Sequence, residues 1–312
     1  MGSFAVALNV VSPLVALMAI GYLSRELRWV SGRAFEQMNL LVFRVFLPAM
    51  LFYNIYSSPF EEIIDTKLIA FGVGSVCALF AACAFVARAL SADPAKRGVA
   101  LQAMFRSNFV IYGLPVVQSF YGNRAGSTSM LVSAIVPVFN VLAVVALVMF
   151  RGEKASAASI AKNVATNPLI IATLIGLALS GAGVRLPEAA EKPIAAIVGA
   201  ATPFALIVLG GTFQRQSLKE NRGLLVPVAA IRLLAAPGVF LAAAIALGFR
   251  DLELLSLVTL FGSPVAVSSF SMAQQMGGDS EFAGQVVLLT TTASIFTIFL
   301  WVSALNYFGF IR

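Results

Sequence analysis

The chain has 312 residues, of which 60% are apolar and 11% are charged, and its mean hydropathy is +0.93. Soluble domains carry about 25% charged residues, so this composition excludes a soluble protein and predicts an all-α, polytopic membrane protein. The net charge is +7, but the basic residues fall in short clusters between apolar runs, a pattern of membrane topology and not of nucleic-acid binding. Histidine is absent and Cys77 and Cys83 share one apolar run, so no disulfide, metal site or cofactor is expected.

The apolar runs predict ten transmembrane helices, since each span needs about 20 residues. They are expected at about 4–24, 35–57, 67–90, 97–121, 125–150, 161–181, 190–212, 222–248, 252–276 and 281–308. The segment 151–160 is polar and rich in small residues. It divides a first five-helix unit (1–150) from a second (161–312).

The two units carry matching proline and glycine landmarks. Four pairs are 155 residues apart (168 − 13 = 155, and likewise for the others): Pro13 and Pro168, Gly21 and Gly176, Pro48 and Pro203, Gly122 and Gly277. Coincidence in a chain rich in glycine and proline is the alternative. Because each unit has an odd number of helices, the second must enter the membrane from the opposite face, which gives the inverted repeats of secondary transporters.

The loop charges predict the orientation in the plasma (inner) membrane. The loops after odd-numbered helices hold twelve basic residues, and the remaining loops and the C-terminus hold six. The side with more Lys and Arg faces the cytoplasm. Both termini are therefore expected outside and the linker 151–160 inside.

Two helices carry helix-breaking residues at membrane depth. In the fourth, Gly113 and Pro115 predict a break near 113–115, because proline lacks an N–H and clashes with the carbonyl four residues earlier. In the ninth, Gly262-Ser263-Pro264 predicts a second break. The two Gly-x-Pro motifs are 149 residues apart, so the ninth helix is expected to run about six residues longer past its break. Freed backbone groups need protein or a water-filled cavity around them, so the breaks are expected to meet around a solute. A simple proline kink is the alternative.

Three arginines lie within predicted helices, namely Arg44, Arg106 and Arg232. A charge at a helix centre costs about 2.5–3.5 kcal/mol on insertion scales, so each needs a partner or an aqueous cavity. All fourteen acidic residues fall in or near loops, which favours a cationic cavity that binds an anion. Snorkelling, contact with backbone carbonyls, or pairing with an acidic residue in a loop is the alternative. Polar residues in helices 2, 4 and 9 are further candidates, with helix packing as the alternative: Asn54, Asn108, Gln118, Ser268 and Ser271.

Several stretches resemble signatures of the auxin efflux carrier family, which contains bacterial permeases and the plant PIN-FORMED transporters. They are Asn108-Phe-Val-Ile-Tyr-Gly-Leu-Pro-Val116 with Tyr121-Gly122, Asn167-Pro168 followed by Leu-Ile-Gly176, and Ser263-Pro264-Val265 with Gly277-Gly278-Asp279 and Leu288-Leu289-Thr290-Thr291. The resemblance covers nearly the whole chain. It implies two helices that cross at Pro115 and Pro264, with Asn108 at the position of the family's substrate-site asparagine. It also implies a scaffold of helices 1, 2, 6 and 7, a mobile transport domain of helices 3–5 and 8–10, a homodimer and elevator-type alternating access.

Together these features predict a secondary transporter for a small organic anion, a carboxylate such as malonate or an auxin-like acid, bound where helices 4 and 9 cross. A sodium-coupled symporter of the related bile-acid type is one alternative, and a non-transporting membrane sensor is another. An intramembrane enzyme would need paired acids, a histidine cluster or a nucleophile–base pair within the bilayer, and the predicted helices contain none. The acidic residue that plant members carry in helix 3 is absent, so the sequence leaves the coupling ion open.

Overall fold

The computed structural model describes residues 2–57, 65–122, 126–150, 156–214 and 218–311. Residues 151–155 of the predicted linker lie outside these ranges. Within them, seven helices are long and apolar enough to cross a membrane, or eight if one bent pair counts as a single span. The predicted all-helical, polytopic membrane architecture is therefore confirmed.

Four of the long helices are uninterrupted, namely α1 (Gly2–Glu26), α4 (Thr66–Leu90), α7 (Gly126–Met149) and α10 (Glu188–Thr212). The last helix, α15 (Ser280–Tyr307), is also uninterrupted. Two long helices contain a π turn: α2 (Gly32–Leu41), η1 (Val42–Phe46) and α3 (Leu47–Tyr56) form one, and α11 (Leu218–Ala230), η3 (Ile231–Ala235) and α12 (Ala236–Ala246) form the other. The bent pair, at 62°, is α8 (Ala157–Thr166) and α9 (Pro168–Gly181).

A proline follows each π turn and accounts for the local loosening of the helix. Pro48 comes two residues after η1, and Pro237 comes two residues after η3. Proline cannot donate to the carbonyl four residues earlier. In the second case that carbonyl belongs to Leu233, and the indole N–H of Trp301 on α15 donates to it at 3.0 Å. A neighbouring helix thus satisfies the carbonyl that proline leaves free.

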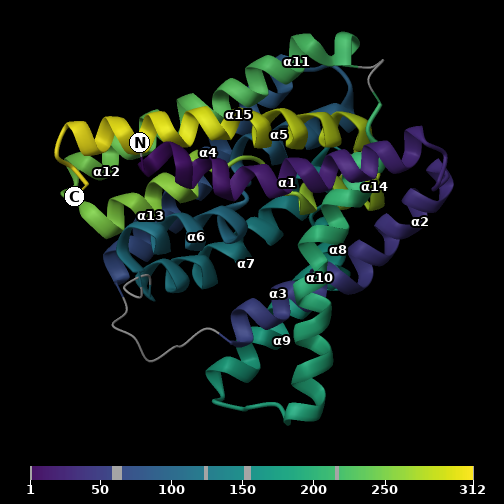
Figure 1. Ribbon diagram of the computed structural model, residues 1–312, viewed down its shortest axis with the longest axis horizontal. Helices are drawn as coiled ribbons and strands as arrows, with labels where there is room; N and C mark the ends of the chain where they lie inside the picture. Colours follow the sequence, from purple (N-terminus) through teal and green to yellow (C-terminus); the bar gives the residue numbers. More distant parts are fainter. Residues whose placement is uncertain (1, 58–64, 123–125, 151–155, 215–217, 312) are drawn as a thin grey trace.

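Two close helix crossings organise one part of the molecule. The helix α1 packs along α10, and α3 packs along α9. In Figure 1, α3, α9 and the start of α10 extend away from α5, α13 and α15, whereas the end of α10 reaches α1 and α15. A Cβ atom on Gly21 would lie 1.9 Å from the carbonyl oxygen of Ile207, and one on Gly176 would lie 2.8 Å from that of Phe52. Glycine is required at both positions because the backbones approach too closely for any side chain.

The fourth and ninth predicted helices are each divided into two half-helices. The ninth consists of α13 (Asp251–Gly262) and α14 (Ser268–Gln275), so the break predicted at Gly262–Pro264 is confirmed. The fourth consists of α5 (Pro94–Phe105) and α6 (Phe109–Tyr121). The prediction of its break near 113–115 is wrong, because α6 runs without interruption through both Gly113 and Pro115.

Local packing explains why Gly113 and Pro115 do not break the helix. A Cβ atom on Gly113 would lie 2.6 Å from the ring of Phe109, so the glycine provides room for that ring inside the helix. Pro115 removes a single internal hydrogen bond, which membrane helices tolerate. The predicted longer extension of the ninth helix past its break is also wrong, since α14 has 8 residues and α6 has 13.

Candidate solute-binding site

The two breaks lie against each other and pair their backbones. The break between α5 and α6 is Arg106-Ser107-Asn108, and Ser107 forms an isolated antiparallel bridge with Val265 in the other break. The N–H of Asn108 donates to the carbonyl of Pro264 at 2.7 Å, and the N–H of Ala266 donates to the carbonyl of Arg106 at 3.4 Å. Groups that the helices leave free at membrane depth are thus partly satisfied by the opposite break. We call this pairing the crossover.

Arg232 joins the ends of the two half-helices that lead into the crossover. This residue is fully buried on η3, and its guanidinium donates to five backbone carbonyls. They belong to Met104 and Phe105 at the end of α5 and to Leu260, Phe261 and Ser263 at the end of α13. A helix C-terminus has free carbonyls and a partial negative charge. Arg232 is therefore a cation that compensates two converging helix ends, and its own donors are occupied by backbone.

Several buried polar atoms at or beside the crossover have no hydrogen-bond partner within the described residues. They are Asn108 Nδ2, Gln102 Oε1 and the hydroxyls of Ser107, Ser263 and Ser269. Asn108 begins α6 at the N-cap position, yet its side chain makes no capping bond, and it is 6% exposed. Buried polar groups in proteins are nearly always satisfied. A cluster of such atoms at one place indicates a polar ligand or water at that place.

Arg106 lies in the same break and is 4% exposed. One terminal nitrogen donates to Met272 Sδ on α14 at 2.6 Å, and the other donates to Asn140 Oδ1 on α7 at 2.7 Å. Asn140 in turn donates to Thr173 Oγ1 on α9 at 3.4 Å. The side chain of Arg106 therefore contacts α7 and α14, and Asn140 links it to α9.

Asn39, which the sequence interpretation missed, connects α2 to the half-helix α14. It is fully buried; its Oδ1 accepts a hydrogen bond from Ser271 Oγ at 2.6 Å and its Nδ2 donates to Gln274 Oε1. Ser271, a predicted site residue, thus binds another helix and not an open cavity. The available signal was an asparagine near the start of the second apolar helix, at the same depth as the polar face of the ninth.

The remaining predicted residues are divided between the crossover and other surfaces. Gly262 and Ser263 are buried at the end of α13, and Ser268 is half-buried at the start of α14. Arg44 is exposed on η1, Gln118 is exposed on α6, and Asn54 is half-buried on α3. Pro115 is exposed within α6, away from the paired backbones.

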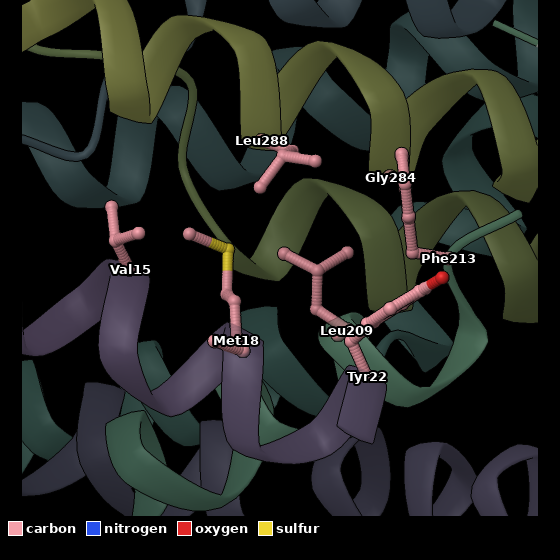
Figure 2. A pocket seen from close by; sticks show the side chains of 9 residues that line it. Val15, Met18, Tyr22, Leu209, Phe213, Gly284 and Leu288 are labelled. Atoms are coloured by element: carbon pink, nitrogen blue, oxygen red, sulfur yellow. The ribbon is translucent and has the colours of Figure 1, made fainter. Parts of the chain in front are cut away.

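Two pockets flank this region and differ in chemistry. A polar vestibule of about 100 Å³ is lined by Arg25, Glu36, Gln214, Gln274 and Glu281 among others. Gln274 also binds Asn39, so this contact lies at the wall of the vestibule. Figure 2 shows the second pocket, which is apolar and lies among α1, the end of α10 and α15, with Met18, Leu209 and Leu288 on its walls. Its lining contains no charged side chain, so it does not suit an ionic solute.

These features define a polytopic membrane protein with two broken spans that cross at a buried polar centre. A profile described as membrane transport protein matches residues 6–302. The chain belongs to this family, the auxin efflux carrier family that its motifs resemble, and it is a transporter and not an enzyme.

Two relatives match along almost the full length. One, from Rhizobium meliloti (strain 1021), bears the name "Putative malonate transporter"; it is 27% identical over 308 residues, which cover 93% of each chain. The other is an "Uncharacterized transporter" from Methanothermobacter thermautotrophicus, 25% identical over 314 residues that cover 96% of this chain and 98% of the relative.

Proposed function

We propose that the chain is a secondary transporter that moves a small organic anion across the membrane and binds it at the crossover. The main support for this proposal is the group of buried, unpartnered donors at the two breaks, above all Asn108 Nδ2. Two buried arginines, Arg106 and Arg232, flank the same breaks. A site of donors and cations favours an anion. The name of the Rhizobium relative makes malonate the first solute to test.

The helix register supports ten spans in two inverted repeats. In this proposal, α5–α6, α8–α9 and α13–α14 each count as one span beside the seven long helices. The helix α1 spans Gly2–Glu26, and the pair α8–α9 spans Ala157–Gly181. The two starts are 155 residues apart (157 − 2), and so are the two ends (181 − 26). Asn108 and Ser263 at the two breaks are also 155 apart (263 − 108), which replaces the 149 obtained from the Gly-x-Pro motifs.

Equivalent contacts in the two units support the same symmetry. Gly21 packs on the carbonyl of Ile207, and Gly176 packs on that of Phe52. The two glycines are 155 residues apart (176 − 21), and so are the two residues whose carbonyls they approach, Phe52 and Ile207 (207 − 52). A pseudo-twofold axis in the membrane plane would relate the two contacts.

We further propose an elevator motion of helices 3–5 and 8–10 against a scaffold of helices 1, 2, 6 and 7. The scaffold crossings are closely packed glycine contacts. Between scaffold and transport domain, the polar contacts instead come from single side chains: Asn39 to α14, Asn140 to Thr173, and Asn167 to Met276. Such contacts can break and reform as one domain slides. With both termini outside, the polar vestibule would open to the cytoplasm and Asn39 would close its inner end. The homodimer remains a prediction from the family resemblance.

Arg232 favours a transporter that does not depend on sodium. In sodium-coupled carriers, carbonyls of broken helices and the C-terminal ends of half-helices coordinate Na⁺. Here five such carbonyls already accept hydrogen bonds from one guanidinium. A fixed cation would thus supply the charge that a coupling ion supplies elsewhere, so the sodium-coupled alternative has no support at this position.

The test is uptake of radiolabelled malonate by the purified protein in proteoliposomes. Asn108→Ala and Pro264→Ala should reduce uptake at least about tenfold, because one removes a site donor and the other changes the backbone of the crossover. Asn163→Ala is the matched control, since Asn163 on α8 only donates to the carbonyl of Ser159 within its own helix. Replacement of Na⁺ by K⁺ should leave uptake unchanged.

Wild-type rates in both site variants would show that the crossover is not the binding site. Uptake that requires Na⁺ would restore the symporter alternative, and measurable malonate binding without flux would favour a sensor.

A further inference from the structure

Arg106 differs from Arg232 in the charge of its partners. Arg232 donates to carbonyls at two helix C-termini, where the aligned peptide dipoles place partial negative charge. Arg106 donates to the thioether of Met272 and the neutral amide of Asn140. A thioether is a weak acceptor, and Arg106 forms no ion pair within the described part of the chain. The buried positive charge of Arg106 is therefore uncompensated.

The surroundings of Arg106 supply the other half of an anion site. The next two residues along the break, Ser107 and Asn108, have a hydroxyl and an amide nitrogen that are buried and unpartnered. One turn earlier, Gln102 Nε2 shares the sulfur of Met272 at 3.6 Å. A guanidinium with two neutral partners beside two free donors suits a carboxylate, which accepts bidentate hydrogen bonds from arginine.

We propose that Arg106 determines the charge of the solute: the site requires one carboxylate, which takes the place of Met272 Sδ on the guanidinium. This inference rests on the proposed function and specifies the substrate class of the same site. Asn140, on the neighbouring helix α7, keeps its hydrogen bond to the guanidinium and orients it. Because Arg232 is saturated by backbone, Arg106 provides one charge to be neutralised. A second acidic group on the solute is tolerated but not required.

Three ligands of nearly equal size separate this proposal from simple polar binding. Malonate has two carboxylates, malonamate has one carboxylate and one amide, and malonamide has two amides. We expect the wild-type protein to bind malonate and malonamate with dissociation constants within about fivefold of each other, and malonamide about 100-fold more weakly, as titration calorimetry in detergent would measure.

Substitutions at both ends of the Arg106–Met272 contact provide the decisive comparison. Arg106→Gln should reduce the preference for malonate over malonamide to less than about fivefold, and Arg44→Gln, which removes an exposed arginine, should leave it unchanged. Met272→Glu places a permanent carboxylate of similar size on Arg106 and should abolish malonate binding. Met272→Gln, its uncharged match, should retain that binding.

The Met272 pair keeps the proposal testable even if Arg106→Gln does not fold. Equal malonate binding by Met272→Glu and Met272→Gln would overturn it, as would a preference for carboxylates that survives Arg106→Gln. Either of these two results would refute only the role of Arg106, provided that the wild type transports malonate and Asn108→Ala abolishes this uptake. If the wild type neither binds nor carries any carboxylate, the proposed function fails first.

Discussion

Replacement of Arg232 by Gln tests what holds the two breaks together. The guanidinium donates to five carbonyls on two half-helices, whereas a glutamine amide is shorter and has two N–H donors. At least three carbonyls would lose their donor. Each buried carbonyl left unsatisfied costs about 1–3 kcal/mol, so the loss should be on the order of 5 kcal/mol. Total stabilities of domains are about 5–15 kcal/mol, so the change should be large.

The assay combines thermal unfolding of the purified protein with amide hydrogen exchange. Arg232→Gln should lower the unfolding midpoint strongly and increase exchange in the peptides that contain residues 102–108 and 258–266. Arg232→Lys keeps the charge and three donors, so its unfolding midpoint should lie between those of Arg232→Gln and the wild type. Arg44→Gln serves as the control, because Arg44 is exposed. Wild-type stability and protection in Arg232→Gln would refute the assignment of Arg232 as the bond between the two breaks.

Two further substitutions test the packing and the motion of the proposed scaffold. Gly21→Val should prevent stable folding, because even a Cβ atom would lie 1.9 Å from the carbonyl oxygen of Ile207. The control is Gly74→Ala, at a helical glycine with nothing within 4 Å, which should be neutral or stabilise the protein by up to about 1 kcal/mol. The yield of monodisperse protein distinguishes the two variants. Asn39→Ala removes the hydrogen bonds to α14 and should lower stability by about 1–3 kcal/mol, measured as a lower unfolding midpoint. It should also accelerate opening and closing of the vestibule, measured by single-molecule fluorescence. Unchanged opening rates would show that Asn39 is only a packing contact.

The two breaks show which part of the site was accessible from sequence. The break in the ninth helix is predicted at its true position because Pro264 lacks a backbone N–H and Gly262 and Ser263 have low helix propensity. The break in the fourth was misplaced because Arg106–Asn108 contains no residue that forces a helix to end. Its conformation depends on the bonds from Asn108 to Pro264 and from Ala266 to Arg106, which connect segments far apart in the chain. Local patterns do not contain such pairings.

The arginines illustrate the same limit. The sequence predicts Arg44, Arg106 and Arg232 within helices and favours Arg44 and Arg106 as site residues. The contacts separate them differently: Arg44 is exposed, Arg232 is saturated by carbonyls, and Arg106 has neutral partners. Asn39 and Met272 were not selected at all. A single asparagine or methionine in an apolar helix is usually a packing residue, and its partner on another helix cannot be derived from spacing.

A structure of the protein with bromomalonate would test the central claim most directly, since the anomalous signal of bromine locates the ligand unambiguously. The account predicts one ligand at the paired breaks, with a carboxylate within hydrogen-bond distance of Asn108 Nδ2 and of the Arg106 guanidinium. A ligand bound instead in the apolar pocket beside Met18 and Leu288, with both breaks unchanged and unoccupied, would contradict it.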